Sequence, residues 1–167
     1  VLLVKVTTTI NPTTKDYLKD AIKEAEKIKS ELLVIELDTP GGLETSMRSM
    51  VKDILSSEIP VIVYVSPKGA RAGSAGVFIT LAGHIAVMAP GTNIGSAHPV
   101  SIGGGEKDSI MSEKVTQDAR AFIRSIAELR GRNAKWAEEA VEKSASLTEK
   151  EALEKKVIDF IAEDLTD

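Results

Sequence analysis

Short apolar runs alternate along the chain with segments in which apolar residues recur at helical spacing. Residues 1–6, 32–37 and 61–65 are almost wholly apolar, as expected of strands buried on both faces. Residues 17–28 and 43–55 lie between these runs, and their apolar side chains are spaced three or four positions apart, which predicts helices. Strand, helix and strand in this order predict parallel βαβ units whose helices cover a sheet.

The second half of the chain continues this pattern with shorter elements. The sequence predicts a helix that begins near residue 75 after a glycine-rich segment, a strand over 85–88, a helix over 114–129, a short helix capped by Asn133, a helix opened by a capping box at Thr148 and Glu151, and a last strand over 157–161. Residues 101–105 and the polar residues after them are predicted to form a long flexible loop. With no internal repeat and no linker, we expect one α/β domain over residues 1–167, built on a mostly parallel sheet with flanking helices.

Composition narrows the classes of partner and cofactor. A net charge of −4 and a pI of about 5.3 give no basic footprint for nucleic acid, which we exclude as a partner. The absence of cysteine excludes disulfides, thiolate metal sites and a cysteine nucleophile. His84 and His98 are too few and too far apart to suggest a metal cluster, and no apolar stretch is long enough to span a bilayer. The chain starts at Val1 inside a strand-like run, so we expect any targeting segment to lie outside it.

Two glycine-bearing turns follow predicted strands, where an open parallel sheet places its ligands. The first is DTPGG over residues 38–42, in which an amide of Gly41 or Gly42 is expected to point outward. The second is GARAGSAG over residues 69–76, which places Ser74 at the start of a predicted helix. Free amides at a helix N-terminus can hold the oxyanion of acyl transfer, so the amide of Ala75 is the second candidate donor.

This pattern leaves alternatives open. Ser74 could simply be an N-cap, while neither glycine string matches a phosphate loop or a dinucleotide fingerprint. A nucleophilic serine needs a base, and the candidates are His84, His98 and Lys114. We expect His84 to be structural, whereas His98 lies in a loop that could face Ser74. A lysine such as Lys114 serves as a base only where burial favours its neutral form.

Several strings, taken in order, resemble the NfeD membrane-bound serine proteases, the stomatin operon partner proteases. They are ELDTPGG over 36–42, PKGARAGSAG over 67–76, MAPGTNIG over 88–95, GRNA over 131–134 and SLT over 146–148. The resemblance covers essentially the whole chain. It implies a crotonase-like fold of the kind found in the Clp protease and in signal peptide peptidase A.

The resemblance also implies roles for particular residues. The serine of the family's GSAG string is the nucleophile, which corresponds to Ser74, and the lysine of its K-[IV]-T string is the base, which corresponds to Lys114. The oxyanion hole corresponds to Gly42 and Ala75. Clp protease instead uses a Ser-His-Asp triad, and His98 falls close to its histidine. The segment expected to hold the acid, residues 138–144, has glutamates but no aspartate, so we favour Lys114 and keep His98 as the alternative base.

The resemblance further implies the partners and the setting. It points to a serine endopeptidase with a Ser-Lys dyad that cleaves hydrophobic segments of membrane-associated proteins such as stomatin, without a metal or organic cofactor. It implies a homodimer or larger homo-oligomer, and a longer membrane-associated protein in which this soluble domain is extracytoplasmic. Two other hypotheses are acyl-CoA chemistry, which shares the crotonase fold, and a non-catalytic scaffold that binds a stomatin-like partner.

Overall fold

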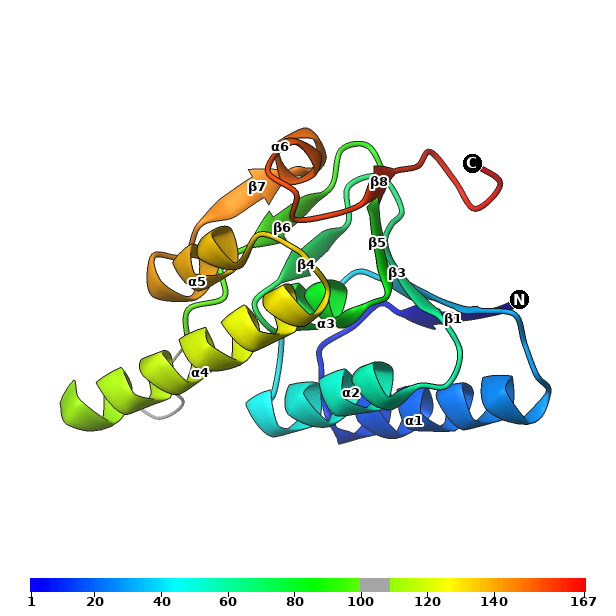
Figure 1. Ribbon diagram of the computed structural model, residues 1–167, viewed down its shortest axis with the longest axis horizontal. Coiled ribbons are helices and arrows are strands. Elements are labelled where there is room, and N and C mark those ends of the chain that lie inside the picture. Colours follow the sequence, from blue (N-terminus) through cyan, green and yellow to red (C-terminus); the bar gives the residue numbers. More distant parts are fainter. Residues whose placement is uncertain (100–108) are drawn as a thin grey trace.

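A computed structural model describes residues 1–99 and 109–167 of the chain. The predicted loop over 101–105 lies outside these residues. The elements follow one another as β1 (Leu2–Val6), α1 (Pro12–Lys27), β2 (Leu33–Leu37), α2 (Glu44–Ser56), β3 (Val61–Val65), β4 (Arg71–Gly73), α3 (Ala75–Ala82), β5 (Ile85–Met88), β6 (Asn93–Gly95), α4 (Ser109–Leu129), α5 (Ala134–Glu142), β7 (Ser146–Thr148), α6 (Glu149–Glu154) and β8 (Phe160–Ile161) (Figure 1).

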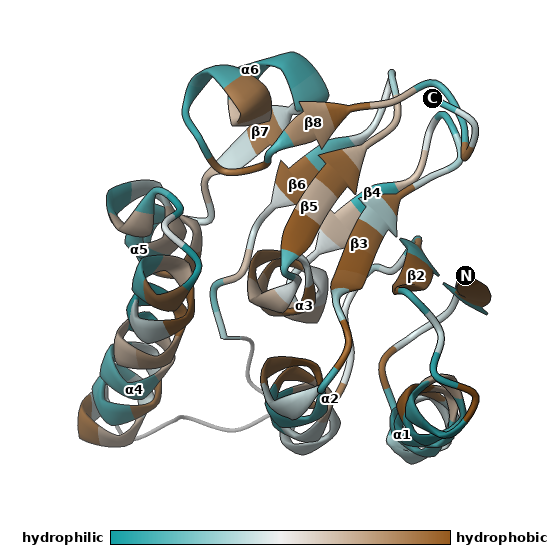
Figure 2. Cartoon of the chain, turned by 45° about the vertical axis from the view of Figure 1, so that its right-hand side comes forward, coloured by the Kyte–Doolittle hydropathy of each residue, from teal (hydrophilic) through white to brown (hydrophobic). Residues whose placement is uncertain are grey.

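The main sheet has five strands in the order β1-β2-β3-β5-β8, and every neighbouring pair is parallel. In its central register Val4 lies beside Ile35, Ile35 beside Val63, and Val63 beside Ala86. Helices α1, α2 and α3 lie on the same side of this sheet (Figure 2). The predicted βαβ units, the mostly parallel sheet and the α/β class are therefore confirmed.

The core is aliphatic, and it lies between the sheet and the helices. Alternate strand residues such as Ile35, Val63 and Met88 point to the helices and are fully buried. The opposite face of the sheet carries a smaller buried cluster that includes Val34, Tyr64 and Val87. Both faces of the strands thus carry apolar side chains, which explains why the strands appear as continuous apolar runs instead of an alternating pattern.

A second sheet of three short strands, β4-β6-β7, was not predicted. Strands β4 and β6 are parallel, and β6 and β7 are antiparallel, with Ile94 paired to both Ala72 and Leu147. Each strand is only three residues long and contains glycine, asparagine or serine, which are poor strand formers. The pairing is therefore set by tertiary contacts and not by local preference.

Two predicted helices begin earlier than their spacing indicated, and the last strand is shorter. Helix α1 starts at Pro12 and not at residue 17, because Asn11 and Thr14 form a reciprocal capping box and proline fits the first helical position. Helix α4 starts at Ser109, five residues before the predicted start, and β8 covers only Phe160–Ile161.

None of the helices in residues 1–99 and 109–167 combines the length and the apolar character that a membrane span requires.

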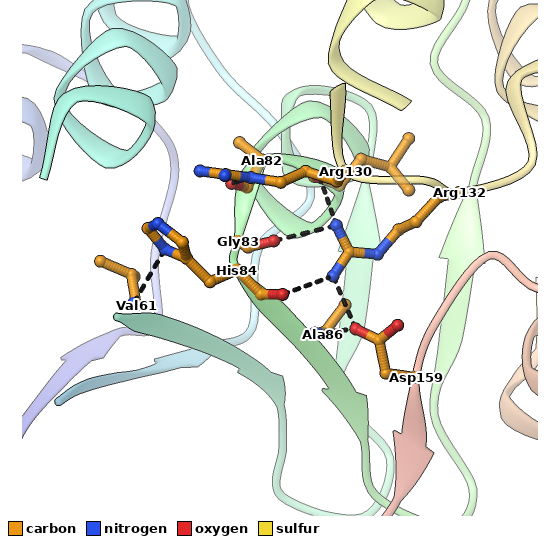
Figure 3. Close-up of polar contacts among 9 residues, drawn as sticks. Val61, Ala82, Gly83, His84, Ala86, Arg130, Arg132 and Asp159 are labelled. Atoms are coloured by element: carbon orange, nitrogen blue, oxygen red, sulfur yellow. Dashed lines mark hydrogen bonds and ion pairs between the residues drawn. The ribbon is translucent and has the colours of Figure 1, made fainter. Parts of the chain in front are cut away.

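The C-terminal end of α3 is held by two arginines (Figure 3). The buried Arg132 guanidinium donates to the carbonyl oxygens of Leu81 and Gly83 at 2.8 and 2.9 Å, and to the Asp159 carboxylate at 2.6 Å. The Arg130 Nε donates to the Ala82 carbonyl at 2.9 Å. Cations at this end satisfy carbonyls that the helix leaves unpaired, so α3 is fixed at the end opposite Ser74.

Candidate active site

Ser74 lies at a sharp turn between β4 and α3, with backbone angles φ 50° and ψ −112°. Its amide donates to the Gly95 carbonyl at 3.1 Å, and its carbonyl accepts from the Val77 amide at 3.0 Å. A serine in this region costs about 1–3 kcal/mol, and such strain is concentrated at functional sites. The Ser74 side chain makes no capping hydrogen bond, so a simple N-cap role does not explain its position.

The Pro-Gly-Gly turn lies directly against Ser74. The chain beyond β2 pairs with β4, since the Thr39 amide donates to the Arg71 carbonyl at 2.9 Å and the Gly73 amide donates to the Thr39 carbonyl at 3.0 Å. A Cβ placed on Gly41, whose φ is +118°, would lie 2.7 Å from the Ser74 Cβ. The two glycine turns singled out in the sequence are therefore adjacent in space.

Two backbone amides at this junction are available as donors. The Gly41 amide is used internally, because it donates to the Thr39 Oγ1 at 3.1 Å. Within residues 1–99 and 109–167, the amides of Gly42 and Ala75 have no acceptor. Gly42 is also fixed by packing, because a Cβ there would lie 2.0 Å from the Ile10 carbonyl oxygen. Of the two glycines considered from the sequence, Gly42 thus has the free amide.

A cleft of about 430 Å³ opens beside Ser74 between α2, α3 and α4. Its walls include the side chains of Met47, Phe78, Val115 and Ala119, together with the charged residues Glu44, Arg48, Lys114 and Asp118. Gly42, Ser74 and Ala75 lie in the same lining. The fold therefore brings Ser74 and Lys114 to one cleft, although forty positions separate them in the sequence.

Lys114 lies in the second turn of α4 and is exposed. The sequence predicted Lys114 at the start of this helix, but α4 begins five residues earlier, at Ser109. Lys114 instead lies on the stripe of α4 that faces the cleft, together with Val115 and Asp118. The arrangement supplies a primary amine on the side of the cleft opposite the serine.

His98 is held by a backbone carbonyl. Its Nδ1 lies 2.7 Å from the Val141 carbonyl oxygen, which can only accept, so Nδ1 carries the proton. Val141 belongs to the segment in which a triad acid was sought, but the contact is not made by a carboxylate. Among the described residues, the cleft lining includes Ala97 and Pro99 but not His98.

His84 is a structural histidine, as predicted. Its Nδ1 accepts a hydrogen bond of 3.0 Å from the Val61 amide at the start of β3 (Figure 3). Burial lowers the pKa of His84 below its usual value, and the nearby Arg130 and Arg132 lower it further. The neutral imidazole is therefore bound to the backbone at the start of β3, which is the central strand of the main sheet.

Sequence reasoning missed the residues that join α4 to the rest of the cleft. Arg48 of α2 pairs with Asp118 of α4, and its guanidinium lies 4.2 Å from the centre of the Phe122 ring. Phe122 in turn stacks on Phe78 of α3, with 5.8 Å between ring centres. A weak signal was present, because Phe78 lies one helical turn after Ser74 and Asp118 one turn after Lys114.

Similarity to solved structures defines the class of protein. The structure matches that of the 1510-N membrane-bound stomatin-specific protease, in a variant with one serine replaced by alanine, with a TM-score of 0.91 and 40% identity over 99% of this chain and 80% of that chain. A variant of the same protease with one lysine replaced by alanine, in complex with a substrate peptide, gives the same TM-score and covers 76% of that chain. ClpP1 from Listeria monocytogenes, at 18% identity, has a TM-score of 0.77 over 98% of this chain and 92% of its own. The fold is therefore that of the Clp proteases.

Sequence similarity then gives the family. The family model for the NfeD1b N-terminal domain matches residues 1–166, and the chain belongs to this family. It is 44% identical over 156 residues to the membrane-bound protease PH1510 of Pyrococcus horikoshii, which covers 92% of this chain and 35% of the relative. It is 36% identical over 92 residues to the membrane protein NfeD1b of Bacillus subtilis, which covers 55% of this chain and 20% of the relative. The chain thus spans about a third or less of each of these relatives.

Proposed function

We propose that this domain is a serine endopeptidase in which Ser74 is the nucleophile and Lys114 the general base. One observation carries the proposal: a strained serine at a helix tip shares a cleft with a lysine from α4 and with two free backbone amides. Nucleophile, base and oxyanion donors are the three parts that acyl transfer needs. The similar protease was studied both as a serine variant and as a lysine variant, which supports the same pair of residue types here.

The proposed reaction proceeds through an acyl-enzyme. The neutral Lys114 amine takes the proton of the Ser74 hydroxyl, and Oγ attacks the carbonyl carbon of the scissile peptide bond. The amides of Gly42 and Ala75 hold the oxyanion, where one such donor is worth roughly 3 kcal/mol. The lysine ammonium then gives its proton to the leaving nitrogen as the C–N bond breaks. Water, deprotonated by the same amine, hydrolyses the ester and regenerates the serine.

A peptide in the cleft would complete this arrangement. Lys114 is exposed, whereas a lysine acts as a base in its neutral form. A bound substrate would displace water from around the amine, and desolvation favours the neutral form. The apolar wall formed by Met47, Phe78 and Val115 favours hydrophobic substrate segments. We therefore propose that hydrophobic peptides are the substrate class.

The finer identity of the substrate and the setting rests on the relatives. A relative described as specific for a stomatin homologue supports a stomatin-like membrane protein as the substrate of this domain. The membrane-bound relative supports a longer, membrane-associated protein. We further propose that this domain is extracytoplasmic in that protein. We also propose a homodimer or larger homo-oligomer, in which a second copy covers the exposed apolar side chain of Met111 on α4.

The test is cleavage of one hydrophobic peptide by four proteins: wild type, Ser74→Ala, Lys114→Ala and His98→Ala. We expect each of the first two substitutions to lower kcat by roughly 10³-fold or more while the fold is retained, and His98→Ala to keep most of the activity. A fluorophosphonate probe should label wild type and not Ser74→Ala.

Each other result has a defined meaning. Full activity in Lys114→Ala with loss in His98→Ala would replace the lysine by the histidine as base. An unlabelled Ser74, with peptide cleavage absent in wild type, would favour the scaffold or the acyl-CoA hypothesis and overturn the peptidase proposal.

A further inference from the structure

The N-terminal half of α4 carries the proposed base but has little buried contact of its own. The buried residues of α4 are Ile123, Ile126 and Ala127, all in its C-terminal half. Lys114 and Val115 are exposed, and Figure 1 shows the first turns of α4 extending beyond the rest of the domain. Apolar packing therefore fixes one end of α4 and leaves the position of the Lys114 end to other contacts.

On the side of α5, Arg120 pairs with Glu138 and Glu142, and on the opposite wall of the cleft the contact comes from Arg48 of α2. Its guanidinium pairs with Asp118 and with Glu44, and its Cζ lies 4.2 Å from the centre of the Phe122 ring. Among the described residues, the Arg48–Asp118 pair is the one ion pair that joins α2 to α4. An arginine can pair with a carboxylate and stack on an aromatic ring at the same time, because its guanidinium is planar.

The contacts form a line that joins the base to the nucleophile. On α4, Lys114, Asp118 and Phe122 are one helical turn apart and share a face, so the Cα atoms of Lys114 and Asp118 are about 6 Å apart along the helix axis. Phe122 stacks on Phe78, which lies one turn after Ser74 on α3. The contacts of Arg48 with Asp118 and Phe122 thus help to set the width of the cleft between Ser74 and Lys114.

We propose that Arg48 is a positioning residue for the proposed catalytic lysine: by pairing with Asp118 and stacking on Phe122, it holds the N-terminal half of α4 at the distance from Ser74 that proton transfer needs. This rests on the proposed function of the dyad. The Asp118 side chain is 69% exposed, so the pair adds at most about 1 kcal/mol to stability. A displacement of about 1 Å at a reacting group can nevertheless cost about 10²-fold in rate.

The first test measures the position of α4 without using activity. Because the chain has no cysteine, spin labels at Lys52→Cys on α2 and Glu113→Cys on α4 report one distance between these helices. We expect a narrow distribution of distances in the labelled protein that keeps Arg48, and a broad distribution when Arg48→Met is added. The matched control is Arg124→Met, which removes an ion pair between α4 and α5 and should leave the distribution narrow. A narrow distribution in Arg48→Met would overturn the proposal.

The second test uses kinetics on a hydrophobic peptide. Arg48→Met should lower kcat at least 10-fold with KM nearly unchanged, Arg48→Lys should recover part of the loss, and Arg124→Met should match wild type. In a double-mutant cycle, Arg48→Met with Asp118→Asn should be no worse than the poorer single variant, because the two residues act through one contact. A higher KM with an unchanged kcat would show that Arg48 binds substrate, and losses that multiply would show that Arg48 and Asp118 act independently. Either result would overturn the positioning role.

The two proposals fail in different ways. If Lys114→Ala retains full cleavage, the dyad is wrong, and the distance measurement still decides whether Arg48 holds α4. If Ser74 and Lys114 are both required while Arg48→Met keeps the wild-type kcat, the dyad stands and the positioning role is wrong.

Discussion

Glycine at position 42 is required by packing as well as by the proposed chemistry. Any side chain there would meet the Ile10 backbone, and the same residue supplies one of the two free amides beside Ser74. The bridge between Ile10 and Gly42 connects the segment after β1 to the turn after β2. The position of this proposed oxyanion donor is therefore determined by the backbone alone, which cannot change rotamer.

His84 makes the stability of the domain depend on pH. Its pKa is lowered in the folded protein, mainly by burial, so the unfolded chain binds a proton more readily below about pH 6.5. The stabilisation is fully present above that value and is lost as the pH falls toward the folded pKa. We expect the free energy of unfolding to decrease as the pH falls from about 7 to about 5.

The matched variant is His84→Asn, whose side-chain oxygen can accept the bond from the Val61 amide without titrating. Urea unfolding of this variant should show a flatter pH dependence over the same interval. Equal slopes for wild type and variant would show that the histidine does not contribute.

Among single residues, the sequence could indicate as candidates those that lie in a distinctive local string. Ser74, Gly42 and Ala75 lie in short glycine-rich turns whose chemistry depends on the backbone next to them. Arg48 and Asp118 could not be found this way, because each is an ordinary charged residue on an amphipathic helix. Only the fold, which brings α2 and α4 to opposite walls of one cleft, gives them a common role.

Helix α3 is fixed by different chemistry at its two ends. Its first residues lie at the glycine turn of Ser74, while its last carbonyls accept from Arg132 and Arg130. The Arg132 side chain is 2% exposed and also pairs with Asp159, which in turn accepts from the Ala86 amide. This arginine therefore links α3, β5 and the segment before β8.

Replacing Arg132 should cost much more than replacing its neighbour. Arg132→Met leaves buried carbonyls and one carboxylate oxygen without a charged donor, so we expect a loss of about 3 kcal/mol in the free energy of unfolding. Arg130→Met removes one bond to the Ala82 carbonyl and should cost about 1 kcal/mol. Urea denaturation of the two variants measures the difference, and equal losses would contradict the role given to Arg132.

At the level of elements, the long periodic segments were predictable and the short ones were not. Strands β1, β2 and β3 were found because buried parallel strands are continuous apolar runs. The start of α1 was misplaced, because Asn11-Pro12 also occurs in turns and only the reciprocal bonds with Thr14 show it as a cap. Strands β4, β6 and β7 owe their pairing to contacts far away in sequence.

At the level of the whole molecule, the end of the chain completes the sheet. Strand β8 pairs with β5, and Asp159 just before it binds both Arg132 and the Ala86 amide. Ending the chain after Val157 should therefore abolish cooperative folding, with a loss of more than about 5 kcal/mol.

A shorter truncation provides the control. Ending the chain after Ala162 keeps β8 and removes an ion pair between Lys68 and Glu163, whose side chains are both 63% exposed. We expect this protein to unfold cooperatively within about 1 kcal/mol of wild type. Circular dichroism during urea titration distinguishes the two truncated proteins. Cooperative unfolding of the protein that ends after Val157 would contradict the structural role of β8.

The late position of β7 has a consequence for the protein during its synthesis. The Ser74 amide is bound by the Gly95 carbonyl in β6, and β6 is paired in turn with β7, which begins only at Ser146. On the ribosome, the nascent chain thus contains Ser74 long before the strand that supports its backbone has been translated. Because the turn that holds Ser74 depends on a strand that lies more than seventy positions later in the sequence, we expect this turn to reach its final geometry only after β7 has been translated.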